Sequence, residues 1–311
     1  MANSPMALGL AMGMLGAIGF SGKAIIVKLA YRHGVDTVTL LMLRMLLALP
    51  FFMAMVWWTQ HRKGAVPVRL SVREWLGVVW LGFCGYYLAS FLDFAGLQYV
   101  SASLERLILY LYPTLVLLLG ILLYGKRATR HQWMGMAVSY VGVVAVFAHE
   151  VRLTGADVGL GAALVFGSAV SYALYLSYSG ELVRRLGALR LVGLASCVAC
   201  VLCVGQFVLL RPMSVVAELG AEVWWLSVLN ASLCTVLPVV LVMLSIERIG
   251  SALASQAGMV GPMSTLVMAA LVLDEPLSPW LLLGTALVMS GVFICSRGQD
   301  RSSRPLPSPV E

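Results

Sequence analysis

Besides Lys28, five charged residues stand inside long apolar runs of the chain: Lys23, Arg44, Asp93, Glu105 and Arg106. A charged side chain in a bilayer costs roughly 2.5–3.5 kcal/mol on insertion scales, so each residue needs a partner or a role. Three are cations and two are carboxylates, so they can form ion pairs with one another. Ion pairs that open and close could act as a gate. A carboxylate against an apolar wall can also take up a proton near neutral pH, because loss of water disfavours its charged form.

A purely structural role is the alternative for these charges. Ion pairs can anchor neighbouring helices, and Lys and Arg side chains can reach the headgroups from within the membrane. Glu105 and Arg106 are adjacent, so on a helix they point about 100° apart and each must meet a residue of another helix. We expect both to face a cavity or its outer gate, with Lys23, Arg44 or Asp93 within ion-pair reach.

A second set of residues combines aromatic rings with polar groups. Tyr172 and Tyr175 are three residues apart and share one face of a helix. Rings with polar tips suit a pocket for amphipathic metabolites, although helix packing or an interfacial aromatic belt would use the same side chains. The candidates for the pocket are Tyr110, Ser168, Tyr172, Tyr175, Asn230 and Gln256.

Three prolines lie within apolar runs: Pro113, Pro238 and Pro262. A proline inside a membrane helix frees a backbone carbonyl and can kink the helix. Broken helices near the middle of the membrane can help a protein open alternately to its two sides, and a tolerated kink is the simpler alternative.

Signatures of catalysis are weak. The segment Gly19-Phe20-Ser21-Gly22 has the form of an intramembrane protease motif, but all four His residues fall in loops or at the ends of apolar runs. The six Cys residues have no His or carboxylate beside them, so neither a zinc site nor a disulfide is expected. We therefore expect no catalytic residue, no metal and no cofactor, and no ATP use, because a phosphate-binding loop is missing.

The composition indicates the class of protein that must hold these residues. Hydrophobic side chains make up 60% of the 311 residues and charged ones 11%, with a mean hydropathy of +0.93. So few charges cannot cover a water-facing surface, which excludes a soluble globular protein. The net charge of +7 therefore indicates loops on one side of a membrane rather than a nucleic-acid partner.

A membrane-spanning helix needs about 20 mainly apolar residues. The sequence predicts an all-α polytopic membrane protein with ten such helices. The expected runs are 6–28, 38–58, 75–98, 101–124, 132–148, 158–178, 190–210, 223–245, 251–273 and 279–296. The remaining C-terminal stretch, 297–311, is polar and rich in Pro and Ser, so we expect a disordered cytoplasmic tail.

The basic residues predict the orientation. Of the 21 Lys and Arg residues, four fall within the apolar runs, and only Arg32, Arg152 and Arg211 fall in loops opposite to the N-terminus. The other fourteen share the side of the N-terminus. Because cytoplasmic loops collect Lys and Arg, both termini are expected in the cytoplasm, with the protein in the cytoplasmic (inner) membrane.

The chain also repeats itself in two halves. Matches recur at an offset of 150 residues and, after one deletion, of 149. The matched pairs include Trp75 with Trp225, Ser101 with Ser251, Pro113 with Pro262, Gly135 with Gly284 and Gly142 with Gly291. Each half holds an odd number of spans, so the second half is inserted upside down. Inverted repeats are typical of secondary transporters, which bind substrate near the midplane between the halves.

Two stretches resemble the EamA family of the drug/metabolite transporter superfamily. They are FAGLQYVSAS at 94–103 and LDEPLSPWLLLGTALVMSGV at 273–292, and Arg44 resembles an Arg found in the second span of that family. The resemblance divides the chain into five-helix repeats at 6–148 and 158–296. One departure is that Lys126 stands in the first half where the second half has Glu275.

The resemblance implies a secondary transporter that exports a small metabolite, amino acid or drug-like compound by alternating access, and not an enzyme. It adds Ser21, Tyr86 and Tyr87 to the expected cavity. The expected partners are a small-molecule substrate and the lipid bilayer, with protons as a further candidate; the oligomeric state stays open. An uptake permease, a membrane-embedded enzyme and a membrane scaffold are the alternatives.

Overall fold

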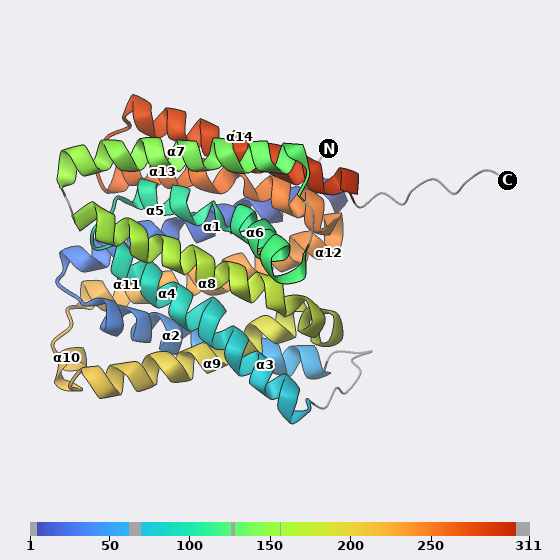
Figure 1. Cartoon of the computed structure of the whole chain (residues 1–311). Coiled ribbons are helices and arrows are strands. Elements are labelled where there is room, and N and C mark those ends of the chain that lie inside the picture. The colour runs from blue at the N-terminus through green and yellow to red at the C-terminus, as the bar shows by residue number, and fades with distance from the viewer. Residues whose placement is uncertain (1–4, 62–69, 126–127, 156, 303–311) are drawn as a thin grey trace.

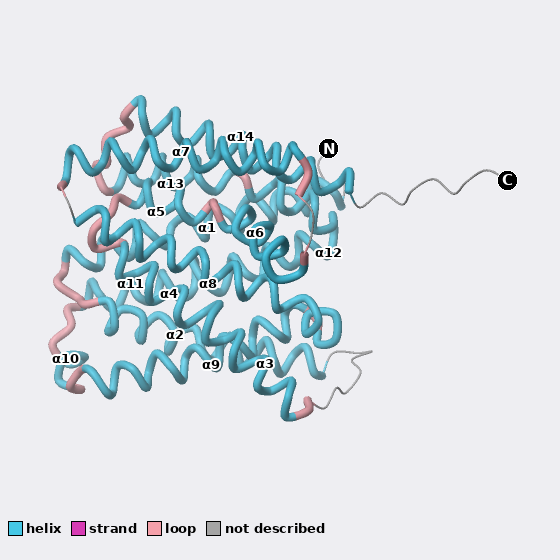
Figure 2. The backbone as a smooth tube through the Cα atoms, in the orientation of Figure 1, coloured by secondary structure: helices cyan, strands magenta, loops and turns pink. Residues whose placement is uncertain are grey.

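The computed structural model describes residues 5–61, 70–125, 128–155 and 157–302, which form a bundle of helices (Figure 1). Loops between them are short, and the described residues contain no β-strand (Figure 2). The helices, with η for a π-helical segment, are α1 (Pro5–Arg32), α2 (Thr37–His61), α3 (Val72–Gly82), η1 (Phe83–Leu88), α4 (Ala89–Gly96), α5 (Ala102–Leu109), α6 (Tyr112–Tyr124), α7 (Arg130–Thr154), α8 (Asp157–Leu186), α9 (Ala188–Leu210), α10 (Ser214–Ala217), α11 (Ala221–Ala231), η2 (Ser232–Val236), α12 (Leu237–Gly258), α13 (Val260–Val272) and α14 (Pro279–Ser302).

Most of these helices are long and apolar enough to cross a membrane. The described part of the chain holds eight such stretches, three of them built from consecutive segments such as α3, η1 and α4. Two further apolar helices, Gln256–Val272 and Pro279–Cys295, are shorter. The chain is therefore an all-α, multi-pass membrane protein, although the expected number of ten spans is not confirmed.

The last helix is longer than the sequence indicates. We expect a disordered tail from residue 297, whereas α14 continues to Ser302. Residues 303–311, the rest of that tail, lie outside the described residues, as do Lys126 and several of the basic residues used to predict orientation.

Helix pairing relates the two halves to each other. Spans that correspond in the repeat pack together across the molecule: α2 with α9, α5 with α13, and α7 with α14. Two further pairs, α1 with α12 and α4 with α8, exchange places when the halves are exchanged. The pattern of contacts is thus unchanged by swapping the repeats, as a two-fold relation requires.

Four glycines show the direction of this pairing. A Cβ on Gly135 would lie 2.5 Å from the carbonyl oxygen of Gly291, and one on Gly142 would lie 2.8 Å from that of Gly284. Only glycine allows backbones to approach so closely. The numbers rise along α7 as they fall along α14, so these equivalent helices run antiparallel (Figure 1). Antiparallel equivalents mean that the two repeats are inverted.

The repeats also share their irregular segments. The π-helical segments η1 and η2 contain Cys84 and Cys234, which are matched at the 150-residue offset. Each fourth span of a repeat is broken, between α5 and α6 in the first half and between α12 and α13 in the second. Extra or missing residues in a helical turn rotate all later side chains about the axis, so these segments decide which residues reach the centre.

The three prolines each lie in the first turn of a helix that follows an irregular segment. Pro113 opens α6, Pro238 opens α12 after η2, and Pro262 lies near the start of α13. In a first turn the missing N–H of proline leaves no helix bond unmade. The position matched to Pro238 is Leu88, yet η1 is also π-helical, so proline is not required for that irregularity.

Candidate functional site

A cavity of about 500 Å³ lies between the two repeats. This volume suits a small organic molecule. Most of its wall is apolar, with residues such as Phe20, Met243 and Met259. Its charged and polar lining residues are Lys23, Arg44, Tyr86, Ser90, Asp93, Arg106, Tyr110, Tyr112, Ser168, Tyr172, Ser196 and Thr235.

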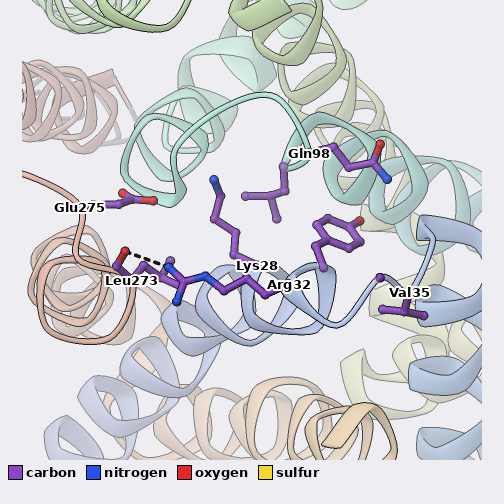
Figure 3. Close-up of a pocket in the computed structure, with 9 residues that line it drawn as sticks. Lys28, Arg32, Val35, Gln98, Leu273 and Glu275 are labelled. Atoms are coloured by element: carbon purple, nitrogen blue, oxygen red, sulfur yellow. Dashed lines mark hydrogen bonds between the residues drawn. The ribbon is translucent and has the colours of Figure 1, made fainter. Parts of the chain in front are cut away.

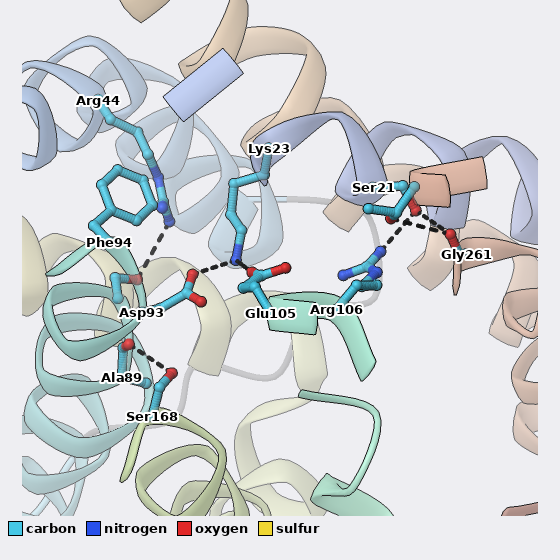
Figure 4. A network of polar contacts seen from close by, with 12 residues as sticks. Ser21, Lys23, Arg44, Ala89, Asp93, Phe94, Glu105, Arg106, Ser168 and Gly261 are labelled. Carbon is cyan, nitrogen blue, oxygen red and sulfur yellow. Dashed lines mark hydrogen bonds and ion pairs between the residues drawn. The ribbon is translucent and has the colours of Figure 1, made fainter. Parts of the chain in front are cut away.

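Lys23 is the centre of the charged group. Its ammonium contacts the carboxylate of Asp93 and lies 3.2 Å from Oε1 of Glu105 (Figure 4). Both carboxylates are buried, with Glu105 fully enclosed and Asp93 2% exposed. One cation on α1 therefore holds two carboxylates from α4 and α5. Glu105 does not itself line the cavity, whereas its partner Lys23 does.

Arg106 connects the first repeat to the second. Its Nη2 donates to Oγ of Ser21 at 2.7 Å, and that oxygen lies 2.7 Å from the carbonyl oxygen of Gly261 in α13 (Figure 4). The Nε of Arg106 has no hydrogen-bond partner. The side chain as a whole is only partly buried and lines the cavity, although its Nε is enclosed.

Arg44 is more deeply enclosed, at 7% exposure. Its guanidinium carbon lies 5.1 Å from the centre of the Phe94 ring, and Nη2 contacts Oγ of Ser90 at 3.5 Å. Nε and Nη1 have no hydrogen-bond partner. Among the described residues no carboxylate lies within 4 Å of either Arg44 or Arg106, so Lys23 is the cation that pairs.

The tyrosines form a connected group of rings. The hydroxyls of Tyr86 and Tyr175 are 3.3 Å apart, and the ring of Tyr175 stacks on Tyr172 with centroids 5.6 Å apart. Tyr112 meets Tyr172 edge to face at 5.7 Å. Tyr110 donates to the carbonyl oxygen of Gly258 at 2.8 Å, across the repeats. Tyr175 supports this wall from behind, because it is buried and does not line the cavity.

Besides Glu105 and Tyr175, four expected cavity residues lie elsewhere. Ser21 is buried and does not line the cavity, although its Oγ accepts the hydrogen bond from Arg106. Gln256 is exposed, because it points roughly opposite to Ala254 and Gly258, which line the cavity on the same helix. Asn230 is fully buried outside the cavity lining. Tyr87 packs its ring 5.7 Å from that of Phe83, one residue away from the cavity-lining Tyr86.

Five residues that line the cavity were not among the expected pocket residues: Lys23, Ser90, Tyr112, Ser196 and Thr235. For Lys23 the sequence gives a signal, its charge within an apolar run. Tyr110 and Tyr112 would point to different sides of an unbroken helix. The break between α5 and α6 places both at the cavity, and the sequence does not reveal that rotation.

A second hollow of about 540 Å³, the vestibule, lies beyond the charged group (Figure 3). Lys28 and Leu97 line it, about one turn further along α1 and α4 than the cavity residues Lys23 and Asp93. Fully enclosed Val27 and Phe94 lie between the two levels. The charged group and this packed layer thus separate the vestibule from the cavity.

Contacts between the repeats close this end of the molecule. Glu275 of the second repeat accepts hydrogen bonds from the backbone N–H groups of Ala102 at 2.7 Å and Ser103 at 3.2 Å. It thereby caps the start of α5, where the helix dipole favours an anion. In return Arg32 donates to the carbonyl oxygen of Leu273 at 3.0 Å (Figure 3). These bonds between the repeats must break if the repeats separate here.

An all-helical membrane fold of two inverted repeats around a central cavity defines a class of membrane transporters. Comparison with known proteins agrees. The model of the EamA-like transporter family matches residues 7–148 and 159–297, which confirms both the resemblance and the two repeats. The chain belongs to the EamA-like transporter family, within the drug/metabolite transporter superfamily.

Similarity to other proteins extends over more than nine-tenths of this chain. It is 30% identical over 302 residues to the uncharacterized transporter YcbK of Bacillus subtilis (strain 168), covering 92% of this chain and 91% of the relative. A protein of known crystal structure matches with a TM-score of 0.64 at 17% identity, covering 93% of this chain and 98% of its own. At that identity the second match supports the fold alone.

Proposed function

We propose that this transporter exports a small metabolite, amino acid or drug-like compound from the cytoplasm by alternating access. The observation that carries the proposal is the cavity between the repeats, which holds charged, hydroxyl and aromatic groups in an otherwise apolar wall. A pocket of this size and composition suits one small amphipathic solute.

In the proposed orientation both termini face the cytoplasm and the vestibule faces outward. The 21 Lys and Arg residues support this, because most of them fall on the side of the N-terminus. A periplasmic reporter such as alkaline phosphatase, fused after Glu311, should stay inactive. An active fusion would show that the orientation is the opposite one, and the vestibule would then face the cytoplasm.

The charged group forms the outer gate in this proposal. Lys23 joins α1 to α4 and α5, while Glu275 and Arg32 join the repeats at the same end. Release of substrate outward requires these contacts to open, and water entering from the vestibule weakens ion pairs by raising the local dielectric. Asp93 and Glu105 are the carboxylates available for proton coupling.

The test uses purified full-length protein in liposomes. Vesicles are loaded with labelled candidate metabolites, and efflux is followed with and without a pH gradient. We expect saturable efflux of at least one solute, abolished by Lys23→Met, with Arg248→Gln as control because Arg248 is exposed and is not among the residues that line the cavity. Efflux indistinguishable from protein-free vesicles for every solute would contradict export, and uptake alone would favour the permease alternative.

A further inference from the structure

The cavity has more positive than negative fixed charge. Three cations line it, Lys23, Arg44 and Arg106, against Asp93 and the Glu105 carboxylate behind Lys23. Asp93 and Glu105 both contact Lys23, and the two arginines have no carboxylate within 4 Å among the described residues. At least one positive charge is therefore uncompensated in a membrane interior, where it is costly.

From this charge balance and the position of Arg106 in the cavity wall, we propose that the substrate is a monocarboxylate with an apolar or aromatic body, and that Arg106 binds its carboxylate. The inference rests on the proposed transport function, because it names the substrate class of the same cavity.

Arg106 is better placed for this role than Arg44. It is only partly buried, and the bond from Nη2 to Ser21 fixes its guanidinium at the cavity wall. The planar fork of arginine matches a carboxylate with two parallel hydrogen bonds. Arg44 also lines the cavity, but it is only 7% exposed, its guanidinium lies over the Phe94 ring, and two of its nitrogens are enclosed without a partner.

The rest of the wall fits the body of such a ligand. With its carboxylate at Arg106, the molecule would extend past Tyr110 and Tyr172 toward Phe20, Met243 and Met259. These side chains offer rings and thioethers rather than hydrogen-bond partners. A zwitterion would fit less well, because its ammonium group would add to the existing excess of positive charge in the cavity.

The test measures binding calorimetrically to the purified full-length protein. Three pairs of probes differ only in the acid group: phenylacetate and phenylacetamide, indoleacetate and indoleacetamide, butyrate and butyramide. We expect at least one acid to bind about tenfold or more tightly than its amide, since hydrogen bonds to charged groups are the strong ones. Phenylalanine, a zwitterion, should bind more weakly than phenylacetate.

Two substitutions assign the preference to Arg106. Arg106→Gln should remove the advantage of acid over amide, and Arg106→Lys, which keeps the charge but loses the fork, should retain part of it. Arg248→Gln is the matched control. Arg248 is an exposed arginine, and its loss should change neither the affinity for the acid nor that for the amide. If Arg106→Gln does not fold, the acid-to-amide affinity ratios of the unchanged protein and of Arg106→Lys still decide whether Arg106 binds the carboxylate.

Equal affinity within all three pairs, including no measurable binding by any probe, would overturn the inference. So would phenylalanine binding as tightly as phenylacetate, or an acid preference that survives Arg106→Gln. Transport in liposomes separates this result from the proposed function. A carboxylate that binds through Arg106 but is never transported leaves the inference standing and contradicts the export proposal.

Discussion

The two repeats share a fold but not a chemistry. The first repeat supplies every charged residue of the cavity lining, including Lys23, Asp93 and Arg106. At the positions 150 residues later, the second repeat has Ala173, Met243 and Gln256. The second repeat instead lines the cavity with hydroxyl, aromatic and apolar groups, such as Ser168 and Tyr172.

This difference separates what builds the bundle from what binds a ligand. The features that the repeats share are backbone features: glycine contacts between α7 and α14, π-helical segments, and breaks in the fourth spans. The features that differ are side chains at the centre. A symmetric scaffold therefore carries an asymmetric site, whose charged groups all come from the first repeat.

The largest effect is expected from Lys23→Met, which leaves Asp93 and Glu105 facing each other without a cation. Breaking a buried ion pair by removing one partner costs about 3–5 kcal/mol. Thermal unfolding in detergent should show a marked loss of stability. The triple variant Lys23→Met, Asp93→Asn, Glu105→Gln should recover much of it, because no charge is then left unpaired.

A control for the variants of the charged group lies in the second repeat. Met243 is the equivalent of Asp93, and Met243→Leu exchanges one apolar side chain for another, so a change below about 1.5 kcal/mol is expected. If the triple variant is no more stable than Lys23→Met alone, pairing is not what stabilises this group.

The next effect concerns the symmetric contact. A Cβ on Gly291 would lie 2.4 Å from the carbonyl oxygen of Gly135 and 2.3 Å from Oγ of Ser139. Gly291→Leu should therefore separate α7 from α14 and destabilise the protein by about 1–3 kcal/mol. Gly205→Ala, at an open position of α9, should leave the melting temperature in detergent nearly unchanged. Equal melting temperatures for the two variants would contradict this role of the glycines.

Much of the scaffold could be predicted from the sequence, because hydrophobic length and the 150-residue register are properties of the chain itself. The site was less predictable. Whether Tyr86 or Tyr87 faces the cavity depends on the π-helical segment η1, and Tyr112 reaches it only through the break after α5. The cap that Glu275 places on α5 joins residues far apart in sequence, and no local pattern indicates it.

A smaller effect is expected at Asp36, in the loop between α1 and α2. Its carboxylate accepts a hydrogen bond from the N–H of Val38 at 3.0 Å and lies 3.2 Å from Nε of Arg211, in the other repeat. Burial alone would raise the pKa of Asp36, but hydrogen bonds from Thr39 and the charge of Arg211 lower it below its usual value.

A lowered pKa in the folded state stabilises the protein above the pKa of the unfolded chain. That stabilisation is lost as the pH falls through the folded-state value. Asp36→Ala should therefore lower stability by about 1 kcal/mol at neutral pH, the usual effect of losing a helix cap. Melting temperatures of the two proteins should converge in acid, and a gap that is the same at every pH would refute the assignment.

The most direct test of the account is which side of the membrane reaches the cavity. Ser90 lines it beside Arg44, so Ser90→Cys in a protein whose native cysteines are replaced by alanine places one thiol there. With the gate closed, a membrane-impermeant methanethiosulfonate should label this thiol from the cytoplasmic face only. Glu275→Gln, which weakens the cap on α5, should add labelling from outside. Labelling from outside alone, or equally from both faces before any substitution at Glu275, would contradict the closed outer gate.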